Sequence, residues 1–210
     1  MSSGRVRIKF CGMTRIEDAR AAAELGVDAI GLVMTRKSKR FPGIENARRI
    51  RRALPPFVAA VALFWNDDPA FIVEAVAAIR PDLLQFHGSE EAPDCVRYGL
   101  PYVKAVGMSG SRGDISALIA AHPQAAGILF DGNAPGEQGG AGVAFDWSHV
   151  PGDCASPVLL AGGLTAANVG QAIRTVRPYA VDVASGIESA PGIKDRDSMQ
   201  RFVAAVRSSE

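Results

Sequence analysis

The chain has 210 residues, 48% of them hydrophobic and 21% charged, which is the profile of a globular α/β domain with room for a packed core. Its 23 basic and 22 acidic residues give a formal net charge of +1, which argues against a nucleic-acid partner and against a polybasic membrane anchor. Residues 57–65, the longest apolar run, are too few to span a membrane, and we expect no signal segment before the first strand. Three scattered cysteines argue against a disulfide framework and a CxxC metal site, so a cytoplasmic location is expected.

Short β-rich runs alternate with amphipathic helical patterns along the chain. In chain order, strands are predicted at residues 6–10, 29–34, 57–64, 83–86, 102–106, 126–130, 158–160 and 180–183. Helices are predicted between and after them, at residues 16–25, 46–54, 69–79, 90–98, 115–121, 166–176 and 196–206. The sixth strand is followed by a Gly-rich stretch and at most a short helix. Strands separated by helices in this way predict βαβ units and a parallel sheet.

Eight such units fit a closed (β/α)8 TIM barrel at the short end of that fold's usual size range. An open, doubly wound sheet is the alternative, but it more often carries a GxGxxG fingerprint in its first turn, and Cys11-Gly12-Met13-Thr14 is not one. No low-complexity linker divides the chain, so residues 1–210 are predicted to form a single domain. Because the active site of a barrel lies at the C-terminal ends of its strands, reactive side chains are sought there.

Cys11 directly follows the first predicted strand. A free cysteine is most often a small buried hydrophobe, and we interpret Cys95, on a predicted helix, and Cys154, in a loop, in that way. The position of Cys11 at a strand-to-helix junction favours chemistry instead. A thiol serves as a base or nucleophile when a cation, a dipole or a hydrogen-bond donor lowers its pKa.

Two charged side chains are expected inside the barrel. Lys9 has the same strand parity as Cys11 and therefore points inward one pleat below it. Asp182, on the eighth strand, is its expected ion-pair partner.

Asp131 closes the sixth predicted strand, where a carboxyl group can donate a proton, although Asp-Gly is also a common turn. Strands one and six are three steps apart around a ring of eight, so Cys11 and Asp131 can approach a ligand from two sides.

Glycine-containing segments close the seventh and eighth predicted strands, at Gly162-Gly163 and at Ser185-Gly186. Glycine lets backbone N–H groups approach an anion closely, and a following helix N-terminus favours negative charge. Barrels often bind phosphate with the loops after these two strands. A tight turn is the alternative reading of either segment alone.

Three further loops follow strand ends. Residues 35–41 are strongly basic and include Arg40, which either lies in a solvated cationic loop or grips a carboxylate. Residues 133–142 contain four glycines and are expected to form a mobile loop over a ligand. His87 follows the fourth strand and is assigned a positioning role, because an acid and a base are already present. Ser89 is predicted to cap the next helix.

Together these motifs resemble the phosphoribosylanthranilate isomerase family, and they run in the family's order from residue 9 to residue 195. The matching segments are Lys9-Phe10-Cys11-Gly12-Met13-Thr14, Lys37-Ser38-Lys39-Arg40, Gln85-Phe86-His87-Gly88-Ser89-Glu90, Asp131-Gly132, Gly139-Gly140-Ala141-Gly142, Phe145-Asp146-Trp147, Leu160-Ala161-Gly162-Gly163-Leu164, Val181-Asp182-Val183-Ala184-Ser185-Gly186-Ile187-Glu188 and Gly192-Ile193-Lys194-Asp195.

The resemblance implies an Amadori rearrangement of tryptophan biosynthesis, which converts N-(5′-phosphoribosyl)anthranilate into 1-(2-carboxyphenylamino)-1-deoxyribulose 5-phosphate with no metal or organic cofactor. It implies that Cys11 is the general base that removes the C2′ proton. It implies that Asp131 is the general acid that protonates the ring oxygen as the furanose opens to a Schiff base. Arg40 would hold the anthranilate carboxylate.

For the remaining positions, the resemblance implies that the phosphate is held by the backbone of four residues, Gly162, Gly163, Ser185 and Gly186. It gives supporting roles to Lys9, His87 and Asp182. The implied partner is a small phosphosugar substrate, with no nucleic acid and no membrane, and the chain is a monomer or a homodimer.

Four positions depart from the family's common pattern. Lys39 stands where proline is common, Ala141 where threonine is common, Ala184 where serine is common, and Gly132 where serine or threonine often follows the aspartate. Ala184 removes one potential phosphate contact. None of the four changes removes the acid, the base or the arginine.

Other functions fit less well. The related histidine-pathway isomerase performs the same rearrangement but typically uses two aspartates, and Cys11 stands in place of one. A metal-dependent phosphosugar epimerase needs clustered histidine and acidic ligands, and only three histidines are present. A catalytically silent phosphate-binding module would not need both Cys11 and Asp131.

Overall fold

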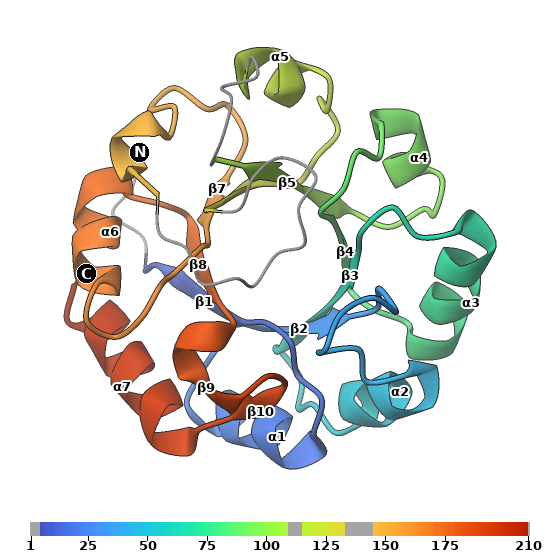
Figure 1. Cartoon of the computed structure of the whole chain (residues 1–210), viewed down its shortest axis with the longest axis horizontal. Helices are drawn as coiled ribbons and strands as arrows, with labels where there is room; N and C mark the ends of the chain where they lie inside the picture. Colours follow the sequence, from blue (N-terminus) through green and yellow to red (C-terminus); the bar gives the residue numbers. More distant parts are fainter. Residues whose placement is uncertain (1–4, 109–114, 133–144, 210) are drawn as a thin grey trace.

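The structure, a computed structural model, describes residues 5–108, 115–132 and 145–209. Eight parallel strands close into a barrel in sequence order, with helices around the outside (Figure 1). The strands are β1 (Arg7–Phe10), β2 (Ala29–Val33), β3 (Ala59–Phe64), β4 (Leu83–Phe86), β5 (Tyr102–Gly107), β6 (Gly127–Asp131), β7 (Val158–Leu160) and β8 (Ala180–Val183). The predicted (β/α)8 barrel is therefore confirmed, and the open doubly wound alternative is wrong.

The helices that cover the barrel follow the strands in alternation. They are α1 (Ile16–Glu24), α2 (Ile44–Arg52), α3 (Pro69–Ile79), α4 (Ala92–Val96), α5 (Ile115–Ala120), α6 (Val169–Val176) and α7 (Arg196–Arg207). Between β6 and β7 the described residues contain only the short 3₁₀ helix η1 (Trp147–His149), as the Gly-rich stretch predicted. Within the described part of the chain, each helix is too short or too polar to cross a membrane.

The segment that follows β8 was not predicted to form regular structure. After β8 the chain forms a 3₁₀ turn, η2 (Ser185–Ile187), and then a small antiparallel hairpin of β9 (Glu188–Ala190) and β10 (Ile193–Lys194). The hairpin lies beside α1 at the rim of the barrel (Figure 1). Lys194 N donates to Asp18 of α1 at 3.0 Å, which fixes the hairpin to that helix.

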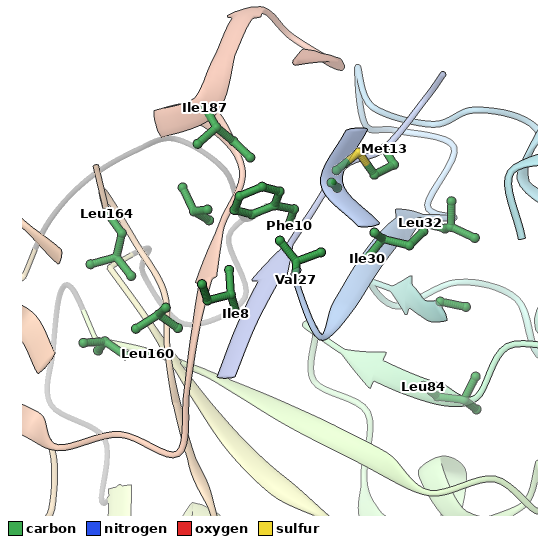
Figure 2. Packing of buried hydrophobic residues seen from close by; sticks show 14 of the residues in the cluster. Ile8, Phe10, Met13, Val27, Ile30, Leu32, Leu84, Leu160, Leu164 and Ile187 are labelled. Carbon is green, nitrogen blue, oxygen red and sulfur yellow. The ribbon is translucent and has the colours of Figure 1, made fainter. Parts of the chain in front are cut away.

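Strand parity divides the buried side chains into an outer and an inner set. Ile8 and Phe10 of β1 point outward and pack with Ile30 and Ile187 between the strands and the helices (Figure 2). Residues of the opposite parity fill the barrel interior, and this inner cluster consists of Val103, Ala105, Leu129, Leu159, Ala161 and Ala180. A residue of inner parity at the C-terminal end of a strand therefore points into the mouth of the barrel.

Several predicted boundaries shift for local reasons. The helix expected at 166–176 begins at Val169, because the Asn168 side chain accepts from Thr165 N at 2.8 Å and donates to the Gly163 carbonyl at 2.9 Å, forming a separate turn. The predicted cap at Ser89 is wrong. The N-cap of α4 is Glu91, and Ser89 Oγ lies 3.1 Å from Asn66 Oδ1 instead.

Candidate functional site

A cleft opens at the C-terminal ends of the strands. It brings together side chains from most of the strands because residues of inward parity near those ends point toward the barrel axis. The lining residues are Cys11, Val33, Thr35, Ser38, Arg40, Leu63, Trp65, Gln85, His87, Asp131, Ala161, Gly162, Gly163, Leu164, Asp182, Val183, Ala184 and Ser185. Cys11 and Asp131 thus face one cleft from β1 and β6.

Cys11 is held over a buried ion pair. Its backbone N–H continues the sheet by donating to the Val183 carbonyl at 2.8 Å. One pleat below, Lys9 Nζ lies 2.7 Å from Asp182 Oδ2, and both side chains are buried, as strand parity predicted. Lys9 also hydrogen-bonds the Cys11 thiol. Gly31 of β2 makes room for them, because a Cβ there would lie 2.7 Å from Cys11 Sγ and 3.2 Å from Lys9 Nζ.

Burial and nearby charge act in opposite directions on the thiol. Desolvation raises the pKa of Cys11 above its ordinary value, and the positive charge and hydrogen bond of Lys9 offset only part of that rise. Burial acts to lower the pKa of Lys9, but the interactions with Asp182 and Cys11 together outweigh burial, so the net pKa of Lys9 is raised. Lys9 therefore stays a cation beside a thiol that is mostly protonated at neutral pH.

Asp131 is contacted from β4. His87 Nε2 lies 3.2 Å from Asp131 Oδ2, and the other ring nitrogen of His87 lies 3.2 Å from Gln85 Nε2. A second ion pair anchors the loop that carries His87: Lys104 Nζ of β5 donates to Glu90 at 3.0 Å and to the Gly88 carbonyl at 2.6 Å. These contacts therefore fix the position of His87 next to Asp131, the candidate acid.

Arg40 reaches the cleft from the basic loop after β2. Its Nη2 lies 2.7 Å from Glu188 Oε2, and its Nε lies 2.9 Å from Glu188 Oε1. The Arg40 side chain is mostly buried rather than solvated. The interpretation of this loop as a solvated cationic segment is therefore wrong at Arg40.

The residues of the two glycine-containing strand ends differ in whether they line the cleft. Gly162 has φ +82°, and a Cβ there would lie 2.2 Å from the Gly132 nitrogen, so only glycine fits between β7 and β6. Gly163 and Ser185 line the cleft beside it. Gly186 and Lys9 are not among the lining residues. A Cβ on Gly186 would lie 2.0 Å from the Leu164 carbonyl oxygen, so this glycine allows the β7 and β8 loops to approach each other.

Three polar atoms in the cleft are buried and have no hydrogen-bond partner within the described part of the chain. They are Thr35 Oγ1, Gln85 Oε1 and Asp182 Oδ1. Such atoms are rare in folded proteins, because leaving one unsatisfied costs about 1–3 kcal/mol. Their gathering in one cleft is typical of a site for a ligand with several hydroxyl groups.

Some functional candidates were missed and others lie outside the described residues. Thr35, Trp65 and Glu188 were given no role, although inward parity after β2 and β3 points to the first two. The Gly139-Gly140-Ala141-Gly142 motif and the expected mobile loop at 133–142 lie outside the described residues. Within residues 5–108, 115–132 and 145–209, no group of three or more histidine, cysteine or acidic side chains is placed to hold a metal ion.

The chain is similar to proteins of one family. A family model for N-(5'phosphoribosyl)anthranilate (PRA) isomerase matches residues 8–205. The N-(5'-phosphoribosyl)anthranilate isomerase of Pseudomonas aeruginosa (strain UCBPP-PA14) is 54% identical over 203 residues, covering 97% of this chain and 96% of the relative.

Two solved structures extend the similarity to three dimensions. A phosphoribosyl anthranilate isomerase crystallised in complex with reduced 1-(o-carboxyphenylamino)-1-deoxyribulose 5-phosphate has a TM-score of 0.85 and 38% identity, over 97% of this chain and 99% of that one. A structure of mutually generated monomers of the dimeric enzyme from Thermotoga maritima has a TM-score of 0.83 and 36% identity, over 96% and 98%.

Proposed function

The chain belongs to the N-(5′-phosphoribosyl)anthranilate isomerase family, and we propose that Cys11 and Asp131 are the base and the acid of its reaction. The reaction is the isomerisation of N-(5′-phosphoribosyl)anthranilate to 1-(2-carboxyphenylamino)-1-deoxyribulose 5-phosphate in tryptophan biosynthesis. One observation carries the assignment of roles: the thiol and the carboxyl group face the same cleft from β1 and β6. The rearrangement needs one group to deliver a proton and another to remove one.

Asp131 begins the reaction. Its carboxylic acid gives a proton to the ring oxygen as the C1′–O bond breaks, which leaves a Schiff base between C1′ and the anthranilate nitrogen. His87 is the positioning neighbour of this acid. When Gln85 Nε2 donates to the ring, His87 Nε2 carries its proton and donates to the Asp131 carboxylate. When the amide turns its oxygen to the ring, His87 Nε2 accepts a hydrogen bond from neutral Asp131 instead.

Cys11 completes the isomerisation. Its thiolate takes the proton from C2′, and the electron pair of that C–H bond forms the C1′=C2′ double bond while the Schiff base nitrogen becomes neutral. The enol that results becomes the C2′ ketone as its C2′ hydroxyl releases a proton and C1′ takes one up. A high thiol pKa makes the thiolate a stronger base but a minor species, and the Lys9 cation supplies the charge that keeps this species accessible.

The two ends of the substrate bind on different walls. Val33, Leu63 and Trp65 give an apolar wall suited to the anthranilate ring, and Arg40 stands beside it for the carboxylate. The phosphate binds to backbone N–H groups around Gly162-Gly163 and Ser185-Gly186. The ribose hydroxyls bond the unsatisfied polar atoms of Thr35, Gln85 and Asp182.

The remaining proposals concern the whole chain. It forms one domain, acts in the cytoplasm and binds a small phosphosugar rather than nucleic acid or membrane. It forms a homodimer, and Phe57 supports this: its side chain is fully exposed and its φ of +70° is unusual for a bulky residue. Aromatic side chains are enriched at interfaces between proteins, so an exposed phenylalanine suits contact with a second copy.

A fluorescence assay tests the function. Purified protein and N-(5′-phosphoribosyl)anthranilate are mixed with and without EDTA, and the fluorescence of the anthranilate group is followed. We expect the same turnover in both samples. Activity that EDTA abolishes and added metal restores would contradict the acid–base mechanism. Turnover of the histidine-pathway aminoaldose in place of the anthranilate substrate would contradict the substrate assignment.

A further inference from the structure

The unpredicted β9–β10 hairpin inserts two buried charges between Arg40 and Cys11. Glu188 of β9 accepts from Arg40 on both carboxylate oxygens, and Lys194 Nζ of β10 lies 2.8 Å from Glu188 Oε1. The exposed fractions of the Arg40, Glu188 and Lys194 side chains are 13%, 4% and 0%. Burying three charges is costly unless each one has partners of good geometry, so this arrangement is a built feature rather than a chance surface contact.

Lys194 anchors the carboxylate to the base of the reaction. Besides Glu188, its Nζ donates to the Cys11 carbonyl at 2.5 Å and to the Ala184 carbonyl at 3.2 Å. All three ammonium hydrogens are therefore used within the protein. Gly192 N also donates to Glu188 Oε1, at 3.1 Å. These contacts fix the position of the Glu188 carboxylate, and therefore the position at which Arg40 can pair with it.

Glu188 in turn fixes the Arg40 guanidinium. Its two oxygens occupy Nε and Nη2, so the Nη1 group stays available on a side chain that lines the cleft. The Arg40 stem lies directly over Gly12, where a Cβ would be 2.5 Å from Arg40 Cδ. Gly12 has φ +78°, which glycine adopts readily, and its lack of a Cβ leaves room for the Arg40 side chain next to Cys11.

The charges of the three side chains sum to one positive charge, which one substrate carboxylate balances. We propose that Glu188, held by Lys194, is a positioning residue that aims Arg40 at the carboxylate of the substrate and makes the site selective for a ring that carries one. This inference rests on the proposed contact between Arg40 and the anthranilate carboxylate.

The test compares two substrates, N-(5′-phosphoribosyl)anthranilate and N-(5′-phosphoribosyl)aniline, which lacks the carboxylate. In Glu188→Gln we expect kcat/KM for the anthranilate substrate to fall about tenfold to a hundredfold, mainly through KM, because a charge-assisted contact is misaligned. We expect kcat/KM for the aniline analogue to change less than about twofold, because no carboxylate is bound. Glu24→Gln is the matched control, since Glu24 also pairs with an arginine, Arg196, but on the surface.

The variant Arg40→Gln separates this inference from the proposed function. If Arg40→Gln and Glu188→Gln both lose the preference for the carboxylated substrate, the inference is supported. If only Arg40→Gln loses it, or if Glu188→Gln slows both substrates equally, Glu188 does not aim the arginine. If Arg40→Gln keeps the preference, the proposed role of Arg40 fails and the inference with it. Should Glu188→Gln not fold, Glu188→Gln with Lys194→Met removes both buried charges together and is read in the same way.

Discussion

The substitution Gly31→Ala, which adds one methyl group, should impair Cys11 as the base without unfolding the protein. The Cβ of Gly31→Ala would lie 2.7 Å from Cys11 Sγ, 3.1 Å from Cys11 Cα and 3.2 Å from Lys9 Nζ. Non-bonded heavy atoms prefer about 3.5–4.0 Å, so the thiol must move by about 0.8 Å or more. That movement pulls the thiol away from Lys9 and from the C2′ proton of the substrate.

The expected effects differ for stability and for catalysis. Overpacking at Gly31 costs about 1–3 kcal/mol of the free energy of unfolding, measured by urea denaturation. A displacement approaching 1 Å lowers kcat about a hundredfold, measured as loss of substrate fluorescence. The Gly31 backbone has no positive φ, so an alanine meets steric contact there and no further backbone strain.

Gly127→Ala is the matched control. Its Cβ would lie 2.8 Å from Leu159 Cδ1 and 3.0 Å from the Pro157 carbonyl oxygen, which is a comparable clash. Gly127 begins β6, about 13 Å along the strand from Asp131. We expect a similar loss of stability with kcat within about twofold of wild type. Wild-type kcat in Gly31→Ala, or equal losses of kcat in both variants, would refute the placement of the base.

Three other outcomes are expected. Because burial raises the pKa of Cys11, the thiolate is the minor form at neutral pH, so the rate at which iodoacetamide alkylates Cys11 should rise about tenfold per pH unit above neutrality, and a rate that is constant from neutral pH upward would contradict the raised pKa. Lys9→Met leaves the buried Asp182 carboxylate without its ion-pair partner and should lower the free energy of unfolding by about 3–5 kcal/mol, measured by urea denaturation. The double variant Lys9→Met with Asp182→Leu should recover most of that loss. Equal losses in the single and the double variant would show that the ion pair is not the cause. If the chain forms the proposed dimer through Phe57, Phe57→Glu should give a monomer in size-exclusion chromatography at unchanged kcat, and an unchanged elution volume would argue against a Phe57 interface.

Strand parity made the barrel and part of its site predictable. Alternation along β1 placed Lys9 inside the barrel, and the register that sets Lys9 opposite Asp182 in β8 gives the ion pair its geometry. The same rule brings Asp131 to the mouth of the barrel, two residues after the inner residue Leu129. These features depend on a period of two residues, which a sequence displays directly.

Other contacts have no local signal. Arg40 and Glu188 are 148 positions apart, and their pairing depends on a hairpin of three and two residues, too short to show an alternating pattern. The start of α6 depends on hydrogen bonds of Asn168, which compete with the helix that propensity alone favours. The direction of the Cys11 pKa depends on the balance between burial and the charge of Lys9, and this balance needs three-dimensional coordinates.

The most direct test of the mechanism is kcat measured side by side for Cys11→Ser and Asp131→Asn, with Cys154→Ser and Asp146→Asn as controls outside the cleft. Acid–base catalysis contributes about 10²–10⁴ to the rate, so each cleft variant should lose kcat by that order while KM changes little and the melting temperature shows a folded chain. The controls should keep wild-type kcat. A folded Cys11→Ser or Asp131→Asn variant with kcat close to wild type would contradict the assignment of that residue as base or acid.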